Sequence, residues 1–172
     1  MTRPRAFTLI EMLAAVALLA VLTAAVTVSL AGAARKARTE DVAEQFAAFE
    51  RATRDAARRF ERTPVLEFDL NRGTIRRTDG ERDAMPLHLA GGVRVKRLIS
   101  GGRDVTYGDA SVRFSALGQS PTYAVLLDGP GGQRLVAFAG LTGQSIVSSD
   151  ERQVRDILSA AAGNAADRTD AR

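Results

Sequence analysis

Side chains that could perform enzymatic chemistry are scarce in this sequence. It contains one histidine, His88, and no cysteine, and no serine lies in the G-x-S-x-G arrangement that presents a nucleophile. The segment around the histidine reads Pro-Leu-His-Leu-Ala, which fits a strand or loop position better than a ligand position. Nucleophilic catalysis needs a nucleophile beside a base, and no such pair is evident. We therefore expect a protein that is not an enzyme.

Two other segments invite comparison with binding loops. Asp79, Glu81 and Asp83 could gather a cation, but Arg82 interrupts them and no bidentate glutamate follows at the spacing of a calcium loop. The glycines within residues 128–133 precede a strand-like segment, whereas a phosphate-binding loop opens a helix. We expect a turn at that place, and we expect neither a metal nor a cofactor.

A different chemistry is indicated by Glu11, a carboxylate near the start of an apolar run from Phe7 to Ala34. A charge inside hydrocarbon costs roughly 2.5 to 3.5 kcal/mol even on insertion scales, so such a residue usually has a function. The side chain could instead reach the headgroup region, which would explain why the charge is tolerated. The residues alone leave both interpretations open.

A third group of candidates is cationic and recurs at steps of three or four positions: Arg51, Arg54, Arg58 and Arg62. On a helix this spacing predicts one basic stripe, and its simplest interpretation is a solvated face carrying i,i+4 ion pairs such as Glu50–Arg54. The alternatives are contact with acidic neighbours or with phosphates. The net charge of only +4 and the acidic residues interspersed with the arginines speak against nucleic acid as a partner.

The element that must position Glu11 is long enough to cross a membrane. Residues 12–34 make about 23 helical positions, or roughly 34 Å, against a hydrocarbon core of roughly 30 Å. Arg3 and Arg5 precede the span and favour a cytoplasmic N-terminus, whereas Arg35 and Lys36 follow it and weaken that assignment.

A secretory signal peptide cleaved near Ala31–Ala34 is the alternative for this segment, although the run exceeds the usual apolar core of about 7 to 15 residues. A helical period continues after it, which speaks against cleavage there. The recurring positions are Val42, Phe46, Phe49, Thr53, Ala56 and Phe60. No proline lies between residue 9 and Pro64, so we expect one helix from about residue 9 to about residue 61.

Beyond Pro64 the period alternates, which predicts strands. The expected strands cover residues 65–70, 74–78, 92–99, 111–116, 123–127, 134–139 and 143–147. Hairpin turns are expected at Asn71–Gly73 and Asp128–Gly132. The fold class is then α+β: a long N-terminal helix whose second half packs Val42, Phe46, Phe49 and Phe60 onto a C-terminal antiparallel β-rich domain.

The segment Ala6-Phe7-Thr8-Leu9-Ile10-Glu11-Met12 resembles the leader of type IV prepilins, which pilins share with type II secretion pseudopilins. The resemblance implies that a prepilin peptidase cuts between Ala6 and Phe7 and that the new N-terminal Phe7 is methylated. Ala6 stands where glycine is the commoner residue. The resemblance also implies that Glu11 pairs with the α-amino group of a neighbouring subunit, because either charge alone would be penalised in a helix bundle.

The C-terminal part extends the resemblance more loosely. Four segments are similar to the succession found in GspH/FimT-type minor pseudopilin domains: Met85–Leu87, Gly91–Val95, Val112–Ser120 and Leu141–Gly143. This implies a minor pseudopilin of a type II secretion pseudopilus, whose partners are other major and minor pseudopilins and the inner-membrane secretion platform. A FimT-like minor pilin that binds DNA for uptake is the alternative, as is a periplasmic protein with an ordinary signal peptide.

These interpretations divide the chain into five parts and give it a single-pass place in the inner membrane, with a cytoplasmic N-terminus and a periplasmic C-terminal domain. The parts are a leader at 1–6, a transmembrane and filament-core helix at 7–34, an amphipathic helix at 35–62, a β-rich domain at 63–149, and a tail at 150–172 with a short helix at 151–162.

Overall fold

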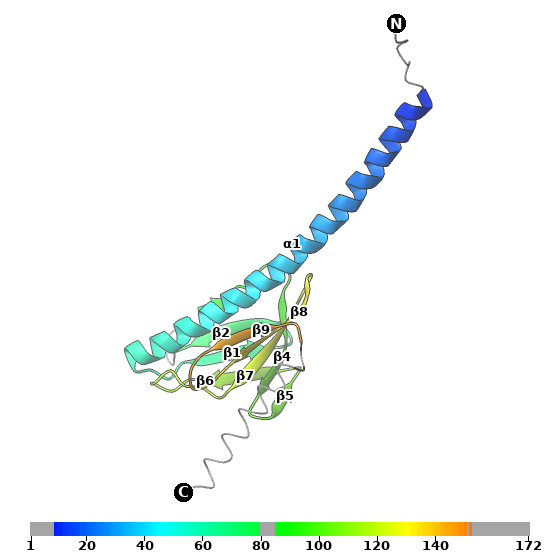
Figure 1. Cartoon of the computed structure of the whole chain (residues 1–172). Coiled ribbons are helices and arrows are strands. Elements are labelled where there is room, and N and C mark those ends of the chain that lie inside the picture. Colours follow the sequence, from blue (N-terminus) through cyan, green and yellow to red (C-terminus); the bar gives the residue numbers. More distant parts are fainter. Residues whose placement is uncertain (1–8, 80–84, 151, 153–172) are drawn as a thin grey trace.

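The computed structural model describes residues 9–79, 85–150 and 152, and its dominant element is one long helix. Helix α1 runs without interruption from Leu9 to Phe60, 52 residues, which is roughly 78 Å at the helical rise. Its N-terminal half projects away from the rest of the chain, and its C-terminal half lies across the β domain (Figure 1). The helix ends where Glu61 takes a positive φ of 51° and Arg62 N donates to Ala57 O at 3.1 Å. The predicted continuous helix is confirmed.

The β domain consists of two antiparallel sheets. The four-stranded sheet has the order β3-β2-β1-β6, and the five-stranded sheet has the order β5-β4-β7-β8-β9. The strands are β1 (Val65–Asp69), β2 (Thr74–Thr78), β3 (Met85–Leu87), β4 (Arg94–Ser100), β5 (Arg103–Val105), β6 (Asp109–Arg113), β7 (Tyr123–Gly129), β8 (Gly132–Phe138) and β9 (Ser145–Ser148). With α1, these strands confirm the expected α+β class and its pilin-like architecture.

All seven predicted strands are present, and the largest error at a strand end is three residues, where β6 ends at Arg113 instead of 116. The turn at Asn71–Gly73 is also present, because Asp69 Oδ1 accepts hydrogen bonds from Asn71 N at 3.0 Å and Arg72 N at 2.9 Å. Strands β3 and β5 are not among the predictions. Each has only three residues, too few for an alternating pattern to be recognised.

The hydrophobic core lies between the two sheets and the inner face of α1. Phe46 is fully buried and packs edge-on against Phe68 and Phe138, with ring centroids 6.2 and 5.2 Å apart. Val42 is also buried, and Phe49 is partly buried against the same core. The prediction that Phe60 joins this stripe is wrong, because its side chain is 60% exposed at the end of the helix. Ala57 takes the last buried position instead.

The β7–β8 hairpin meets α1 where the apolar run ends. Gly131 N donates to Thr39 Oγ1 at 3.1 Å. A Cβ at Gly131 would lie 2.3 Å from Arg35 O, so the hairpin backbone touches the helix backbone directly and only glycine fits. The domain therefore begins immediately after the projecting half of the helix.

Some predictions fall outside the described residues. These include the leader at 1–6, the acidic side chains Glu81 and Asp83, and the short helix expected at 151–162, of which only residue 152 is described.

Candidate functional site

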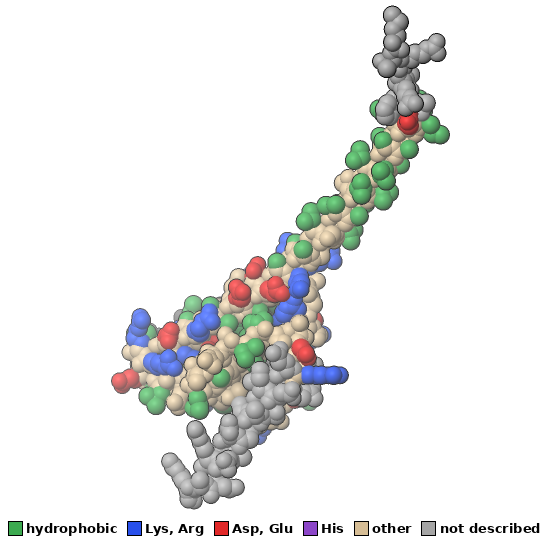
Figure 2. Space-filling view, in the orientation of Figure 1, with side chains coloured by type: hydrophobic (Ala, Val, Ile, Leu, Met, Phe, Trp, Pro, Cys, Tyr) green, Lys and Arg blue, Asp and Glu red, His purple; other side chains and the backbone are tan. Residues whose placement is uncertain are grey.

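The projecting half of α1 is the first candidate site, because it is apolar and exposed on all sides. Its large apolar side chains between Leu9 and Leu30 have exposed fractions from 54% at Leu22 to 80% at Leu9. Among the described residues, α1 is the one helix long and apolar enough to cross a membrane, with a mean hydropathy of 2.5 in its most apolar window. Figure 2 shows hydrophobic side chains along this half, an acidic side chain at its N-terminal end, and most of the charged side chains at and around the β domain. Such a surface needs a bilayer or other apolar helices around it.

The leader residues fall on both sides of the first described position. Leu9, Ile10, Glu11 and Met12 occupy the first turn of α1, whereas Ala6, Phe7 and Thr8 lie outside the described residues. Leu9, Ile10 and Met12 are 80%, 75% and 58% exposed. The carboxylate of Glu11 therefore lies in the first described turn of α1, at the end of the projecting half.

The predicted basic stripe on α1 is not a single surface. Arg51 and Arg58 are exposed, but Arg54 is only 2% exposed, and Arg62 lies beyond the helix end at Phe60. Arg58 uses its Nε to bind Leu117 O at 3.0 Å, and its Nη1 lies 3.8 Å from Asp55 Oδ1. The interpretation of four arginines as one interaction face is wrong, because one of them belongs to the interior.

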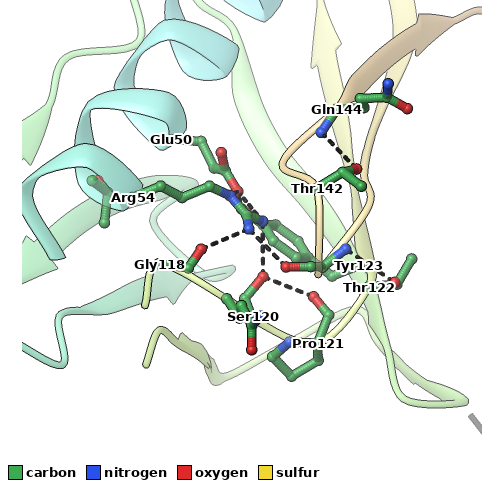
Figure 3. Close-up of polar contacts among 12 residues, drawn as sticks. Glu50, Arg54, Gly118, Ser120, Pro121, Thr122, Tyr123, Thr142 and Gln144 are labelled. Atoms are coloured by element: carbon green, nitrogen blue, oxygen red, sulfur yellow. Dashed lines mark hydrogen bonds and ion pairs between the residues drawn. The ribbon is translucent and has the colours of Figure 1, made fainter. Parts of the chain in front are cut away.

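Arg54 is the centre of a buried polar cluster that joins the helix to two loops (Figure 3). Its Nε donates to Glu50 Oε1 at 2.7 Å, and its Nη2 lies 2.6 Å from the same oxygen. Its Nη1 donates to Gly118 O at 2.9 Å and Gly140 O at 2.7 Å. Its Nη2 also donates to Ser120 Oγ at 2.9 Å. We call Arg54 with Glu50 and these loop acceptors the Arg54 clamp.

The carboxylate of Glu50 is fully buried, so its charge depends on the clamp. Burial raises the pKa of the Glu50 carboxyl, and the hydrogen bond and positive charge of Arg54 oppose that rise. Tyr123 donates to Glu50 Oε1 at 3.4 Å, and burial together with the negative charge of Glu50 holds the pKa of Tyr123 well above its usual value. Within the described part of the chain, Glu50 Oε2 has no hydrogen-bond partner.

The clamp brings together two of the loosely matching C-terminal segments. The Arg54 guanidinium lies 5.2 Å from the centroid of the Phe114 ring and binds Gly118 and Ser120 from the same segment. The second segment, Leu141–Gly143, also packs against Arg54, since a Cβ at Gly143 would lie 2.9 Å from the Arg54 Cδ. Residues of both segments therefore surround the same buried side chain, Arg54.

The chemistry of this cluster is that of a structural contact. Its guanidinium is saturated by one carboxylate, two carbonyls and a hydroxyl, and Arg54 is only 2% exposed. His88 is exposed beyond the end of β3. Asp79 forms an ion pair with Arg77, in which Asp79 Oδ1 lies 3.2 Å from Arg77 Nε. In the part of the chain that the structure describes, no group of three His, Asp or Glu side chains is placed to hold a metal ion.

The clamp is not among the predictions, because Glu50–Arg54 has the i,i+4 spacing of a surface ion pair. A signal was available: Glu50 follows Phe46 by four positions and precedes Thr53 by three, so it lies on the buried face.

Comparison with known proteins gives one match. The family model described as the prokaryotic N-terminal methylation motif matches residues 1–27. No curated protein matches the chain, and no solved structure does. The matched residues include the predicted cleavage junction, Glu11 and much of the projecting apolar helix. This N-terminal methylation motif, on a transmembrane-capable helix that continues into an antiparallel β domain, indicates a type IV pilin-like protein.

Proposed function

We propose that the protein is a minor pseudopilin, a non-enzymatic structural subunit of a type II secretion pseudopilus that serves protein export across the outer membrane. The observation that carries this proposal is the methylation motif at the start of a helix that is exposed and apolar for its first half and then becomes part of a folded core. A helix of this kind can be stored in a bilayer and later bundled with similar helices. The globular domain would lie in the periplasm and the N-terminus in the cytoplasm.

The choice of a GspH-type domain is supported by the clamp. The similar segments Val112–Ser120 and Leu141–Gly143 are far apart in sequence, yet residues of both contact Arg54. A shared structural contact gives a physical reason for both segments to occur in one chain.

The DNA-binding alternative loses support for the same reason. Arg54, one of its four candidate phosphate ligands, is buried and already bound by protein groups. Each phosphate contact contributes about −0.9 to the slope of log affinity against log salt, so losing one weakens a site of this kind substantially.

Processing is the first test. Coexpression of the full-length chain with a prepilin peptidase is expected to yield a product that begins at N-methylated Phe7, because the basic leader is followed directly by the apolar helix. Mass spectrometry of the intact product measures both changes. A product that begins near Arg35 would instead identify an ordinary signal peptide, and an Ala6→Gly variant provides the positive control for cleavage.

Glu11 is the second test. We expect Glu11→Ala to insert into the membrane at least as well as the parent chain and to enter filaments at least tenfold less, because insertion no longer carries a charge while assembly loses one side of its charge pair. The measurement is the amount of the chain in sheared filament fractions relative to membranes. Glu44→Ala, which removes an exposed carboxylate from the same helix beyond the span, is the matched control. Normal incorporation of Glu11→Ala would defeat the charge-pair account.

A further inference from the structure

We propose that Arg35, Lys36 and Arg38, here called the basic collar, bind the phosphate groups of anionic phospholipids at the membrane surface from which the globular domain emerges. The inference rests on the membrane-resident stage of the proposed function. It goes beyond that function because it assigns a lipid-binding site and the residues that form it.

The position of the collar along α1 is the first argument. Residues 9–34 extend roughly 39 Å, about 9 Å more than a hydrocarbon core, whereas core and headgroup layers together measure roughly 40 to 45 Å. The next turn of the helix, which carries the collar, therefore falls at the level of the headgroups. At about 100° per residue, the three positions fall within roughly 160° of the helix circumference, so they form one basic face, and all three side chains are exposed.

The order of charges is the second argument. The three cations are followed, farther from the span, by the carboxylates of Glu40, Asp41 and Glu44. Asp41 lies roughly 10 Å beyond Ala34, which exceeds the screening length of about 8 Å in physiological salt. An anionic membrane surface at the end of the span would therefore attract the three cations and would repel the more distant carboxylates only weakly.

The availability of the cations is the third argument. In an isolated helix Lys36 would pair with Glu40 at i+4. Here Glu40 Oε1 instead accepts from Arg134 Nη2 of β8 at 2.9 Å. None of the ion pairs found among the described residues includes Arg35, Lys36 or Arg38. The fold thus engages the nearest carboxylate elsewhere and leaves the collar available to phosphates.

The β domain also holds the collar in place. Gly131 in the tip of the β7–β8 hairpin packs on the helix backbone at Arg35 and Lys36, and Gly91 lies beside the Arg38 side chain. The helix is therefore braced at the level of the collar, and these cations are presented from a fixed backbone. Fixed geometry lowers the entropy lost when each side chain binds a phosphate.

The experiment is an equilibrium titration of the full-length chain in detergent with phosphatidylglycerol or phosphatidylcholine of identical acyl chains, with bound lipids counted by native mass spectrometry. Each cation near an anionic surface contributes about fivefold to binding, so we expect at least a tenfold preference for the anionic lipid. This preference should decrease as salt is raised. The triple variant Arg35→Gln, Lys36→Gln, Arg38→Gln should reduce it to within about twofold of parity.

The matched control is Arg51→Gln, Arg59→Gln, Arg113→Gln, which removes the same charge from exposed positions outside the collar. It should keep the lipid preference, as should the charge-conserving variant Arg35→Lys, Arg38→Lys. Retention of the preference in the collar variant, or an equal loss in the control, would overturn the inference. Peptidase processing of each variant is measured in parallel. If the parent chain is processed correctly but shows no lipid preference, the lipid-binding inference is rejected and the proposed function is not. If the parent chain is not processed, the proposed function is rejected.

Discussion

Replacing Arg54 with methionine is expected to lower the free energy of unfolding by about 3 to 5 kcal/mol, because it leaves the buried carboxylate of Glu50 without its partner. The same change removes the donor to Gly118 O and Gly140 O, which are held in two separate loops. Methionine keeps most of the side-chain length, so the loss reports on charge and hydrogen bonds more than on volume. Denaturant unfolding of the full-length chain in detergent, followed by circular dichroism, measures it.

Arg51→Met is the control for this prediction, because Arg51 lies three positions earlier on an exposed face. Its effect should remain within about 0.5 kcal/mol. The double variant Glu50→Leu, Arg54→Met should be more stable than Arg54→Met alone, since it removes the uncompensated charge. A loss below 1 kcal/mol in Arg54→Met would mean that the clamp contributes little to stability.

Phe46→Ala should cost about 3 to 5 kcal/mol, because it opens a cavity where the helix meets both sheets. The Phe46 ring is fully buried between Phe68 of β1 and Phe138 of β8. We expect the helix to remain formed and the β domain to lose its main apolar contact with it. The measurement is again unfolding in detergent, with limited proteolysis to show whether the β domain opens first.

Phe60→Ala provides the comparison on the same helix, since its side chain is 60% exposed. We expect a change within about 0.5 kcal/mol. Equal losses in the two variants would contradict the assignment of the buried face. The pair therefore tests the correction to the predicted apolar stripe directly.

Much of the fold was predictable because long patterns determine it. The apolar run and the three- and four-residue steps after it predict a single helix, and the structure has one from Leu9 to Phe60. Strands β7 and β8 were predicted from apolar runs on both sides of a glycine-rich turn, and they pair in register from Tyr123–Phe138 to Gly129–Gly132. Each of these patterns extends over several residues, so a single exception does not obscure it.

The centre of the domain was less predictable because its partners are distant in sequence. Arg54 is bound by carbonyls 64 and 86 positions away, and a carbonyl carries no side-chain signature. Charge pairs at i,i+4 are usually solvated, so the sequence indicates a surface ion pair for Glu50–Arg54. The Phe60 error has a related cause, since a periodic pattern gives no indication of where the sheet beneath it ends.

The contact between the β7–β8 hairpin and α1 has a consequence for the order of folding. Gly131 N and Thr39 Oγ1 are 92 positions apart, so the helix emerges during synthesis long before the hairpin that covers it. Until β7 and β8 are made, the apolar side chains of Val42 and Phe46 lack their cover and form a surface prone to aggregation. Contacts of such long sequence separation also slow the final step, because a long loop must close before they form. In a nascent chain anchored by the N-terminal half of α1, the apolar face of the second half would therefore stay uncovered until β7 and β8 are synthesised.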